Sequence, residues 1–552
     1  MAASLLIASC SPVSTAPQSP GAAPSGSSGP AGSDAVSASA GTGACAAPAA
    51  LPWWNDRIFY EVFVRSFQDS DGDGIGDIKG LIGKLDYLND GDPSTTTDLG
   101  VTGLWLMPIA ESPSYHGYDV TNYTKVEPDY GSVEDVKALV EAAHDRGIAV
   151  IPDLVLNHTS VEHPWFVDSE TNGSPHADWY RWSDTDPGET RTDGTPVWHE
   201  KGGRWYYGYF WEGMPDLNLA NPAVTTELDN VAKFWLKDVG VDGFRLDAIR
   251  YYLEDGPRLE DLPASKTWLS TFKGHVVGVN PEAVLVGEAY TDTKAAASWL
   301  PAVDLTFDFG YATAMLTSVK SYSAAAARTA LQESLAAYPP GQRGVFLTNH
   351  DQPRVMAELA DPALAKTAAE LLLTSPGVPF VYYGEEVGLD GTKPDEQIRT
   401  PMPWTAKGPG VGFTTGTPWE APSAGFEAAN VATENSDPAS LLSTYRTLIQ
   451  LRGANSALSV GDAVVLDTSD DTVLAVARRS TEETVLVITN LGITAASGPT
   501  VDLSPLGGCI PTGGGTAIYG SATIAPAGGD LTAYRPVDQL APGQTVVIRL
   551  GE

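Results

Sequence analysis

The stretch Gly243-Phe-Arg245-Leu-Asp247 decides the expected fold, because an apolar run that ends in charged residues is typical of a buried strand that opens onto a site. Three further runs end in the same way, namely Asp153-Leu-Val-Leu-Asn157-His158, Val286-Gly-Glu288-Ala289 and Phe346-Leu-Thr-Asn-His350-Asp351. Carboxyl ends of parallel barrel strands converge on one mouth. We therefore expect these polar side chains to be neighbours in space.

Eight apolar runs, separated by stretches of helical periodicity, predict an α/β fold with a closed (β/α)8 TIM barrel. The predicted strands are residues 58–67, 101–108, 149–158, 241–249, 283–290, 305–309, 344–351 and 378–385. Helices are expected at 132–146 and 223–238, where apolar residues recur every three or four positions.

The rest of the chain divides around this barrel. Residues 158–216 are too long and too rich in Trp, Gly, Asp and Pro for a plain connection, so they predict an inserted subdomain after strand 3. The barrel then comprises 51–157 and 217–455. Short alternating strands at 472–478, 484–489 and 545–550 predict a C-terminal β-sandwich over 456–552.

Three carboxylates end predicted strands, and they suit cleavage of a glycosidic bond. That reaction needs one carboxylic acid to protonate the leaving oxygen and one carboxylate to attack or support the anomeric carbon. Arg245 lies two residues before Asp247, hence on the same face of the strand, and its charge would keep Asp247 ionised. Glu288 would then be the protonated acid.

The four segments together resemble the alpha-amylase family of retaining glycosidases, family 13, over almost the whole chain from Trp53 onward. The resemblance implies that Asp247 is the nucleophile, Glu288 the acid/base, and Asp351 a carboxylate that binds sugar hydroxyls. It further implies substrate contacts that belong to two groups: Arg245, His158 and His350 around the ring, and Tyr118 and His116 in the segment Tyr115-His116-Gly-Tyr118-Asp119.

Specificity is less determined by these motifs. The segment Met214-Pro-Asp216-Leu-Asn218 resembles the fingerprint of a group intermediate between oligo-1,6-glucosidases and neopullulanases, and it favours hydrolysis of alpha-1,4-glucans or maltooligosaccharides. Ala248 and the stretch Arg399-Thr-Pro-Met402-Pro-Trp404 resemble oligo-1,6-glucosidases instead. An exo-acting alpha-glucosidase therefore stays open, as does a transglycosylase or isomerase on the same fold.

Each residue also has a plainer interpretation. Asp153 is expected to end its strand in a structural role, and Tyr118 or His158 alone would be ordinary core residues. A carbohydrate-binding barrel without catalysis is a remote alternative. Such barrels usually lack one or more of the three carboxylates, and here all three are present.

The segment Asp69-Ser-Asp71-Gly-Asp73-Gly-Ile75-Gly-Asp77 predicts a structural Ca2+ site. Carboxylates at positions one, three, five and nine, with the carbonyl of Ile75 at position seven, match the first part of an EF-hand loop. Oligo-1,6-glucosidases hold calcium in similar loops. A second calcium site of amylases uses Asn157 and a histidine where this chain has Tyr251, so that site is in doubt.

Composition and the N-terminus bear on location and partners. The 552 residues include 33 basic and 69 acidic side chains, and a net charge of -36 disfavours nucleic acid as a partner. Ser4-Leu-Leu-Ile-Ala-Ser-Cys10 resembles a lipobox, which implies a lipid anchor at Cys10 and an extracellular, cell-surface lipoprotein. The Ala-, Ser-, Pro- and Gly-rich remainder of residues 1–50 predicts a disordered tether. We expect a monomer.

Only three cysteines occur in the chain. If Cys10 carries lipid, Cys45 and Cys509 remain, either as a disulfide or as two free thiols.

Overall fold

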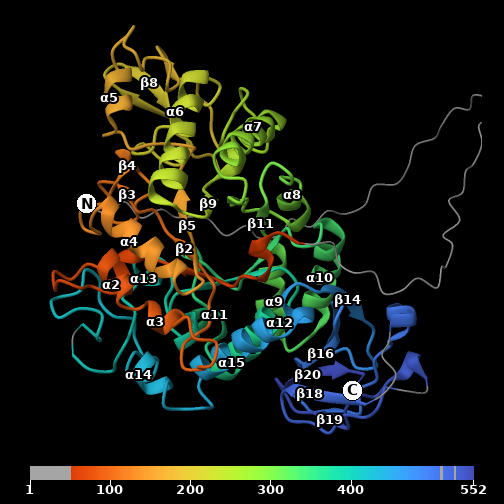
Figure 1. The fold of residues 1–552 in the computed structure, drawn as a ribbon. Helices are drawn as coiled ribbons and strands as arrows, with labels where there is room; N and C mark the ends of the chain where they lie inside the picture. The colour runs from red at the N-terminus through yellow and green to blue at the C-terminus, as the bar shows by residue number, and fades with distance from the viewer. Residues whose placement is uncertain (1–50, 409, 510–513, 528–529, 552) are drawn as a thin grey trace, which may run out of the picture.

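The computed structural model describes residues 51–551 except 409, 510–513 and 528–529. The predicted tether, the lipid-bearing Cys10 and Cys45 lie outside the described residues. The fold is an eight-stranded parallel barrel, followed in the chain by a C-terminal sheet domain, as the sequence predicted (Figure 1). No helix in the described part of the chain has the length and apolar character needed to cross a bilayer.

The barrel closes in the order β1-β13-β12-β11-β10-β9-β5-β2. Its strands are β1 (Phe59–Val62), β2 (Gly103–Leu106), β5 (Ala149–Leu154), β9 (Gly243–Leu246), β10 (Val284–Gly287), β11 (Leu305–Phe307), β12 (Arg343–Val345) and β13 (Val378–Tyr382). Aromatic and branched side chains fill its interior, and Phe59 stacks on Phe380 with ring centroids 4.9 Å apart.

The strands are shorter than the apolar runs that predicted them. After β1 the chain turns into the short helix α1 (Val64–Phe67), so the predicted strand over 58–67 was wrong in its second half. The reason is that Val64 and Phe67 are buried in the core as helix residues, and an apolar run alone does not separate a strand from a buried helix.

Helices surround the barrel, and their ends follow local sequence signals. In α4 (Val133–His144), Ser132 and Asp135 form a reciprocal capping box, and Val136, Leu139 and Ala143 face the core. The predicted helix over 223–238 is α6 (Pro222–Lys233), which continues as the π-helix η2 (Phe234–Val239).

The other helices of the barrel region are α2 (Ile78–Ile82), α3 (Leu85–Leu88), α7 (Pro263–Val279), α8 (Thr293–Ala297), α9 (Phe309–Ser321), α10 (Ala325–Ala337), α11 (Val355–Leu359), α12 (Pro362–Thr374), α13 (Asp395–Ile398), α14 (Val431–Glu434) and α15 (Leu441–Ala454).

Between β5 and α6 the chain leaves the barrel and builds a small aromatic-rich unit, seen at the top of Figure 1. It holds α5 (Pro164–Ser169) and a sheet of order β6-β8-β7, formed by β6 (Trp182–Ser183), β8 (Arg204–Tyr207) and β7 (Trp198–Lys201). A hairpin of β3 (Ala110–Glu111) and β4 (Asn122–Val126) follows β2.

The C-terminal region, which begins with α16 (Ser456–Ser459), contains a five-stranded sheet of order β14-β15-β16-β20-β18 and a two-stranded sheet of β17 and β19. The strands are β14 (Asp462–Leu466), β15 (Val473–Arg479), β16 (Thr484–Asn490), β17 (Ala496–Ser497), β18 (Gly515–Tyr519), β19 (Gln539–Leu540) and β20 (Thr545–Leu550). Side chains from both sheets share one apolar core. In Figure 1 this domain lies beside α12 and α15.

Buried arginines join this domain to the barrel. Arg478 on β15 donates to the carbonyls of Thr374, Leu458 and Gly461 at 2.8, 2.9 and 3.1 Å. Arg452 on α15 donates to the carbonyls of Leu373, Ser375 and Gly377 in the barrel and, at 3.3 Å, to that of Ser459 in the C-terminal domain. These guanidinium groups satisfy carbonyls at and after the end of α12 that would otherwise be buried without donors.

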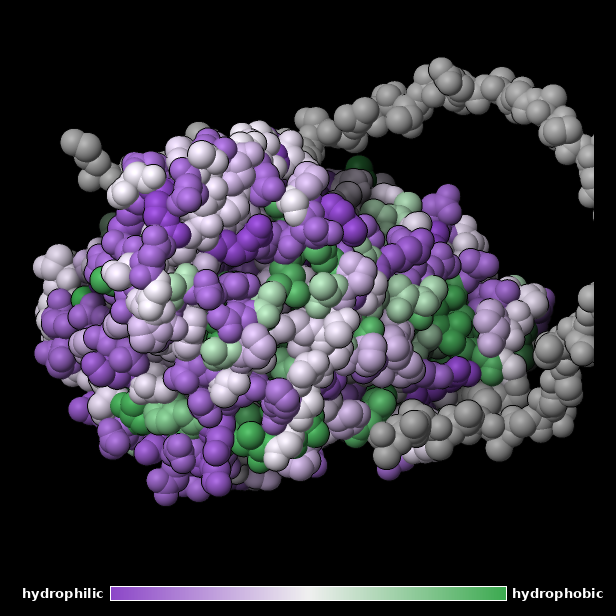
Figure 2. Space-filling view, turned by 90° about the horizontal axis from the view of Figure 1, so that it is seen from above, coloured by the Kyte–Doolittle hydropathy of each residue, from purple (hydrophilic) through white to green (hydrophobic). Residues whose placement is uncertain are grey.

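The surface agrees with the acidic composition. On the face shown in Figure 2, hydrophilic side chains predominate and apolar ones form small patches. Large apolar side chains that are exposed within the described residues, such as Val167 and Ile493, lie far apart in the sequence.

We predict that Arg478→Met destabilises the protein much more than Arg479→Met. Loss of Arg478 leaves three buried carbonyls without donors, so the free energy of unfolding should fall by about 2 kcal/mol or more. Arg479, the next residue of β15, forms a partly exposed ion pair with Asp462, and its loss should cost about 1 kcal/mol or less. Denaturant unfolding of both variants measures the difference, and equal losses would contradict it.

Candidate active site

Arg245 is the centre of the polar cluster at the carboxyl ends of the strands. Its side chain is 0% exposed, and Nη1 donates to both carboxylate oxygens of Asp153 at 2.8 Å and to Oδ1 of Asp247 at 2.9 Å. Nη2 lies 3.8 Å from Oε2 of Glu288. The guanidinium group also lies over the ring of Trp105, 5.2 Å from its centroid. One buried cation therefore touches three carboxylates from three strands.

Register brings these residues together. Asp153 on β5 is paired with Arg245 on β9, and Arg245 is paired with Val286 on β10, two residues before Glu288. Burial raises the pKa of Asp153 to about 6, against the lowering effect of Arg245. Although burial opposes its charged form too, the pKa of Arg245 is raised by the surrounding carboxylates, so the guanidinium stays charged.

Glu288 lies in a setting that favours its protonated form. Burial raises its pKa to about 7, and the charges of Asp247 and Asp351 add to that effect while Arg245 opposes it. Its Oε2 accepts the N–H of Ala248 at 3.0 Å. Ala248 has a φ of 52°, so the chain turns in the left-handed region directly after Asp247 and aims this amide at Glu288. The turn ties the two carboxyl groups to one geometry.

Asp351 is held by cations instead. Its side chain is half exposed, Oδ2 lies 3.1 Å from Nε2 of His350, and Oδ1 lies 3.0 Å from Nη2 of Arg399. Burial of part of the group opposes ionisation, but His350, Arg399 and Lys393 hold the pKa of Asp351 well below its usual range. The cluster thus contains Glu288, whose carboxyl group tends to be protonated, and Asp351, whose carboxyl group is firmly ionised.

Tyr118 and His116 form one wall of the cluster. The Tyr118 ring stacks on His350 at 5.7 Å, and its hydroxyl donates to Asp153 and lies 2.7 Å from Nε2 of His350. His116 stacks behind Tyr118 at 6.1 Å, and its Nδ1 accepts the Tyr118 N–H. Burial lowers the pKa of His116 to about 4, so this imidazole is neutral.

His158 is buried beside Phe210, and burial lowers its pKa. Its Nε2 has no hydrogen-bond partner among the residues that the structure describes. Asn157, its neighbour, donates to Oδ2 of Asp216 at 3.0 Å, while the Tyr209 N–H donates to Oδ1 at 2.9 Å. Of the two residues that raised the question of a second calcium, Asn157 therefore pairs with Asp216, and Tyr251 stacks on Tyr209 at 4.1 Å.

The acidic loop after α1 gathers three of its predicted ligands. Carboxylate oxygens of Asp69, Asp71 and Asp77 all lie within 4.8 Å of one another. Asp73 is not part of this group, and its Oδ1 accepts the N–H of Ile75 at 2.8 Å. The pKa of Asp69, which partial burial alone would raise, is lowered by hydrogen bonds from Thr414 and from loop amides. Three clustered carboxylates are a donor set that suits a hard cation.

From the sequence we expected only a structural role for Asp153, and Arg399 was not predicted to belong to the cluster. Asp153 forms the shortest ion pair of Arg245, and the apolar run before it marked burial without indicating this partner. Arg399 was noted only for its resemblance to glucosidases, although a lone Arg before an apolar motif was the available signal.

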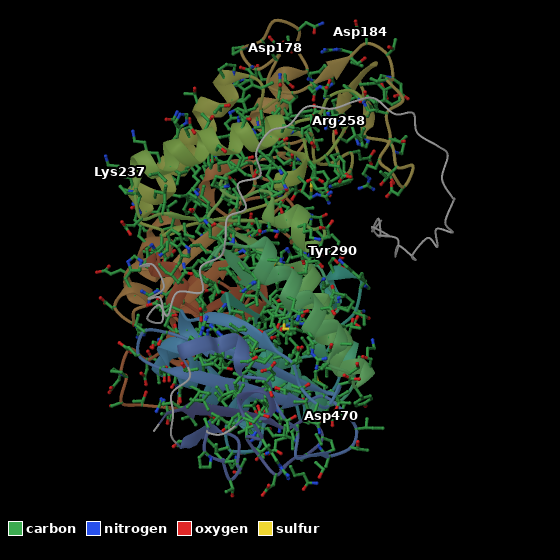
Figure 3. The ribbon with its side chains drawn as sticks, turned by 90° about the vertical axis from the view of Figure 1, so that its right-hand side faces the viewer. Asp178, Asp184, Lys237, Arg258, Tyr290 and Asp470 are labelled. Carbon is green, nitrogen blue, oxygen red and sulfur yellow. The ribbon has the colours of Figure 1, made fainter. Side chains whose placement is uncertain are left out.

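Tyr290, two residues after Glu288, is 56% exposed, and Figure 3 shows it between Asp184 of the inserted unit and Asp470 of the C-terminal domain.

Comparison with known proteins agrees with this geometry. The family described as "Alpha amylase, catalytic domain" matches residues 61–461. The chain is 38% identical over 449 residues to Alpha-amylase 3 of Dictyoglomus thermophilum, covering 80% of this chain and 85% of the relative. It is 34% identical over 520 residues to the trehalose synthase/amylase TreS of Mycobacterium tuberculosis, covering 81% and 83%.

Among solved structures, the alpha-amylase from H. orenii superposes with a TM-score of 0.78 at 38% identity, over 90% of this chain and 99% of the other. The residues that the family matches, 61–461, contain the polar cluster and all of the barrel except the first two residues of β1. The chain therefore belongs to the alpha-amylase family of glycoside hydrolases, family 13.

Proposed function

We propose that this enzyme hydrolyses alpha-1,4-glucosidic bonds in starch or maltooligosaccharides with retention of configuration. The observation that carries the proposal is the shared contact of Arg245 with Asp247 and Glu288, which pairs one carboxylate with a buried cation beside a carboxyl that favours its proton. The identity of 38% to an alpha-amylase, against 34% to a trehalose synthase/amylase, supports the choice of substrate.

In the proposed mechanism Asp247 attacks the anomeric carbon while Glu288 gives its proton to the leaving oxygen. The product of this step is a covalent glycosyl-enzyme, and Glu288, now ionised, then takes a proton from the water that hydrolyses it. Asp351 binds sugar hydroxyls, Tyr118 lies against the ring, and Arg245, His350, His158 and His116 complete the set of proposed substrate contacts.

Isomerisation or exo-acting alpha-glucosidase activity is the second candidate. Two observations support this candidate. One relative is a trehalose synthase/amylase, and the residue after Asp247 is the small Ala248. These reactions share the first step and differ in what attacks the glycosyl-enzyme: water in hydrolysis, and a sugar hydroxyl in isomerisation or transfer.

The acidic loop is proposed to hold a structural Ca2+ through Asp69, Asp71 and Asp77, with Asp73 and the carbonyl of Ile75 as further predicted ligands. When bound, the ion would neutralise the charge of the loop. It has no part in the proposed chemical steps. The lipid anchor at Cys10 and an extracellular, cell-surface location remain predictions from the sequence.

A product time course tests the proposed reaction. On maltoheptaose, NMR should show early alpha-anomers of mixed short maltooligosaccharides, and Asp247→Asn should lose at least about 10³-fold in kcat because the nucleophile is gone. Glucose as the sole early product would assign an alpha-glucosidase. Conversion of maltose to another disaccharide without net hydrolysis would assign an isomerase.

The pH dependence of kcat/KM tests the role of Glu288. Because a raised pKa of about 7 keeps Glu288 protonated below neutrality, activity on maltooligosaccharides should fall as pH rises through about 7. Glu288→Gln should lose about 10²- to 10⁴-fold on these substrates. It should lose far less on alpha-glucosyl fluoride, whose leaving group needs no proton. Equal losses on both would refute the acid role.

Calcium binding is tested by thermal unfolding with CaCl2 or with EDTA. Excess Ca2+ should stabilise the folded protein, by about 2.7 kcal/mol at a hundredfold excess over Kd. Asp71→Asn should abolish that gain. Asp92→Asn, which removes an exposed carboxylate in the acidic loop after α3, should keep it. A melting temperature that is indifferent to Ca2+ would exclude the site.

A further inference from the structure

Glu61 is a strand carboxylate at the barrel mouth to which the proposed mechanism gives no role. It is the third residue of β1, in register with Trp105 on β2 and Tyr382 on β13, and its side chain is 2% exposed. Its Oε1 lies 2.5 Å from Nδ1 of His350, whose side chain is 0% exposed. A buried carboxylate is costly unless it is paired, and here the partner is an imidazole of the proposed site.

His350 lies between two carboxylates. Its Nδ1 faces Glu61, and its Nε2 faces Asp351 at 3.1 Å and the Tyr118 hydroxyl at 2.7 Å. Carboxylate oxygens only accept hydrogen bonds when ionised, so both ring nitrogens must carry a proton to satisfy both partners. The arrangement makes His350 an imidazolium.

We propose that Glu61 is a positioning residue that keeps His350 doubly protonated, so that His350 donates from Nε2 to Asp351 and holds that carboxylate in its sugar-binding orientation. This inference rests on the proposed role of Asp351 in substrate binding. Glu61 acts through His350, because Nδ1 is on the far side of the ring from Asp351.

The groups around His350 favour its doubly protonated form. Burial lowers its pKa, but the charges and hydrogen bonds of Asp351 and Glu61 outweigh that effect and raise it to about 9. Asp153 on β5 is a third nearby carboxylate, and the nearby cations are Arg399, which donates from Nε to the His350 carbonyl, and Arg245. Trp105 meets the imidazole edge-on at 5.6 Å and fixes the ring plane.

Loss of charge at position 61 has a definite consequence. In Glu61→Gln the amide oxygen still accepts from Nδ1, but one of the two anions that stabilise the imidazolium is gone. A neutral His350 then presents a lone pair from Nε2, which repels Asp351 or accepts from Tyr118. Because a raised pKa protects the protonated form, activity that depends on it is lost as pH rises through that pKa.

The test measures the pH profile of kcat/KM on alpha-glucosyl fluoride. Because fluoride leaves without a proton, the ionisation of Glu288 should not lower activity on the alkaline side of this profile, which is called the basic limb below. For the wild type the limb should lie near pH 9, set by His350. For Glu61→Gln it should shift down by at least about one pH unit, a loss of at least about fivefold at pH 9. Glu61→Asp keeps the charge and should keep the limb, even if its rate is lower.

Glu370→Gln is the matched control. Glu370 on α12 is also a buried glutamate that accepts a hydrogen bond, from the Tyr519 hydroxyl at 2.7 Å, but it faces the C-terminal sheet. This variant should change stability without moving the limb. A wild-type limb in Glu61→Gln, or an equal shift in Glu370→Gln, would overturn the proposal.

A second readout does not need turnover. In ¹⁵N-histidine NMR at pH 8.5, His350 of the wild type, assigned with His350→Gln, should be mostly protonated on both nitrogens, and His350 of Glu61→Gln mostly on one. Absence of any alpha-glucosidic activity in the wild type would count against the proposed function alone. A singly protonated His350 in the wild type would count against the role of Glu61 alone.

Discussion

The burial of one guanidinium group among carboxylates is the constraint on which the active site depends. Arg245 is fully enclosed and cannot lose its proton, so it needs anionic partners inside the barrel. Asp153, Asp247 and Glu288 supply them from three strands, and the ring of Trp105 closes the remaining side. A change in strand register would move these carboxylates away from Arg245 and leave a buried charge unpaired. The geometry of the site therefore depends on the same strand register that closes the barrel.

Burial and the cations that each group meets together set the protonation of the carboxyl groups. Asp247, at 2.9 Å, is paired directly, whereas Glu288, at 3.8 Å and buried, keeps a pKa near 7. Asp351 is ionised by a different pair of cations, His350 and Arg399. Carboxyl groups of different protonation thus lie in one mouth because burial and cationic partners differ from one group to the next.

Much of this could be predicted from the sequence, because carboxyl ends of parallel strands meet at one face. The eight strands, and the presence of Asp247, Glu288 and Asp351 at that face, follow from apolar runs that end in charge. Which of these side chains pair with each other cannot be predicted in this way. Glu61 lies within an apolar run, and nothing in the local sequence indicates that it contacts a histidine 289 positions away. The EF-hand-like spacing likewise marked Asp73 by position, while its side chain turned to the backbone of Ile75.

The arginines between barrel and C-terminal domain have a consequence for how such chains can be rearranged. Arg478 belongs to the sheet, yet the carbonyls it satisfies include that of Thr374, at the end of a barrel helix. The last turn of α12 is thus completed by a residue about a hundred positions later. Barrel and sheet should unfold in one cooperative step, and a catalytic domain cut at residue 455 would be an unfinished barrel, not an independent module.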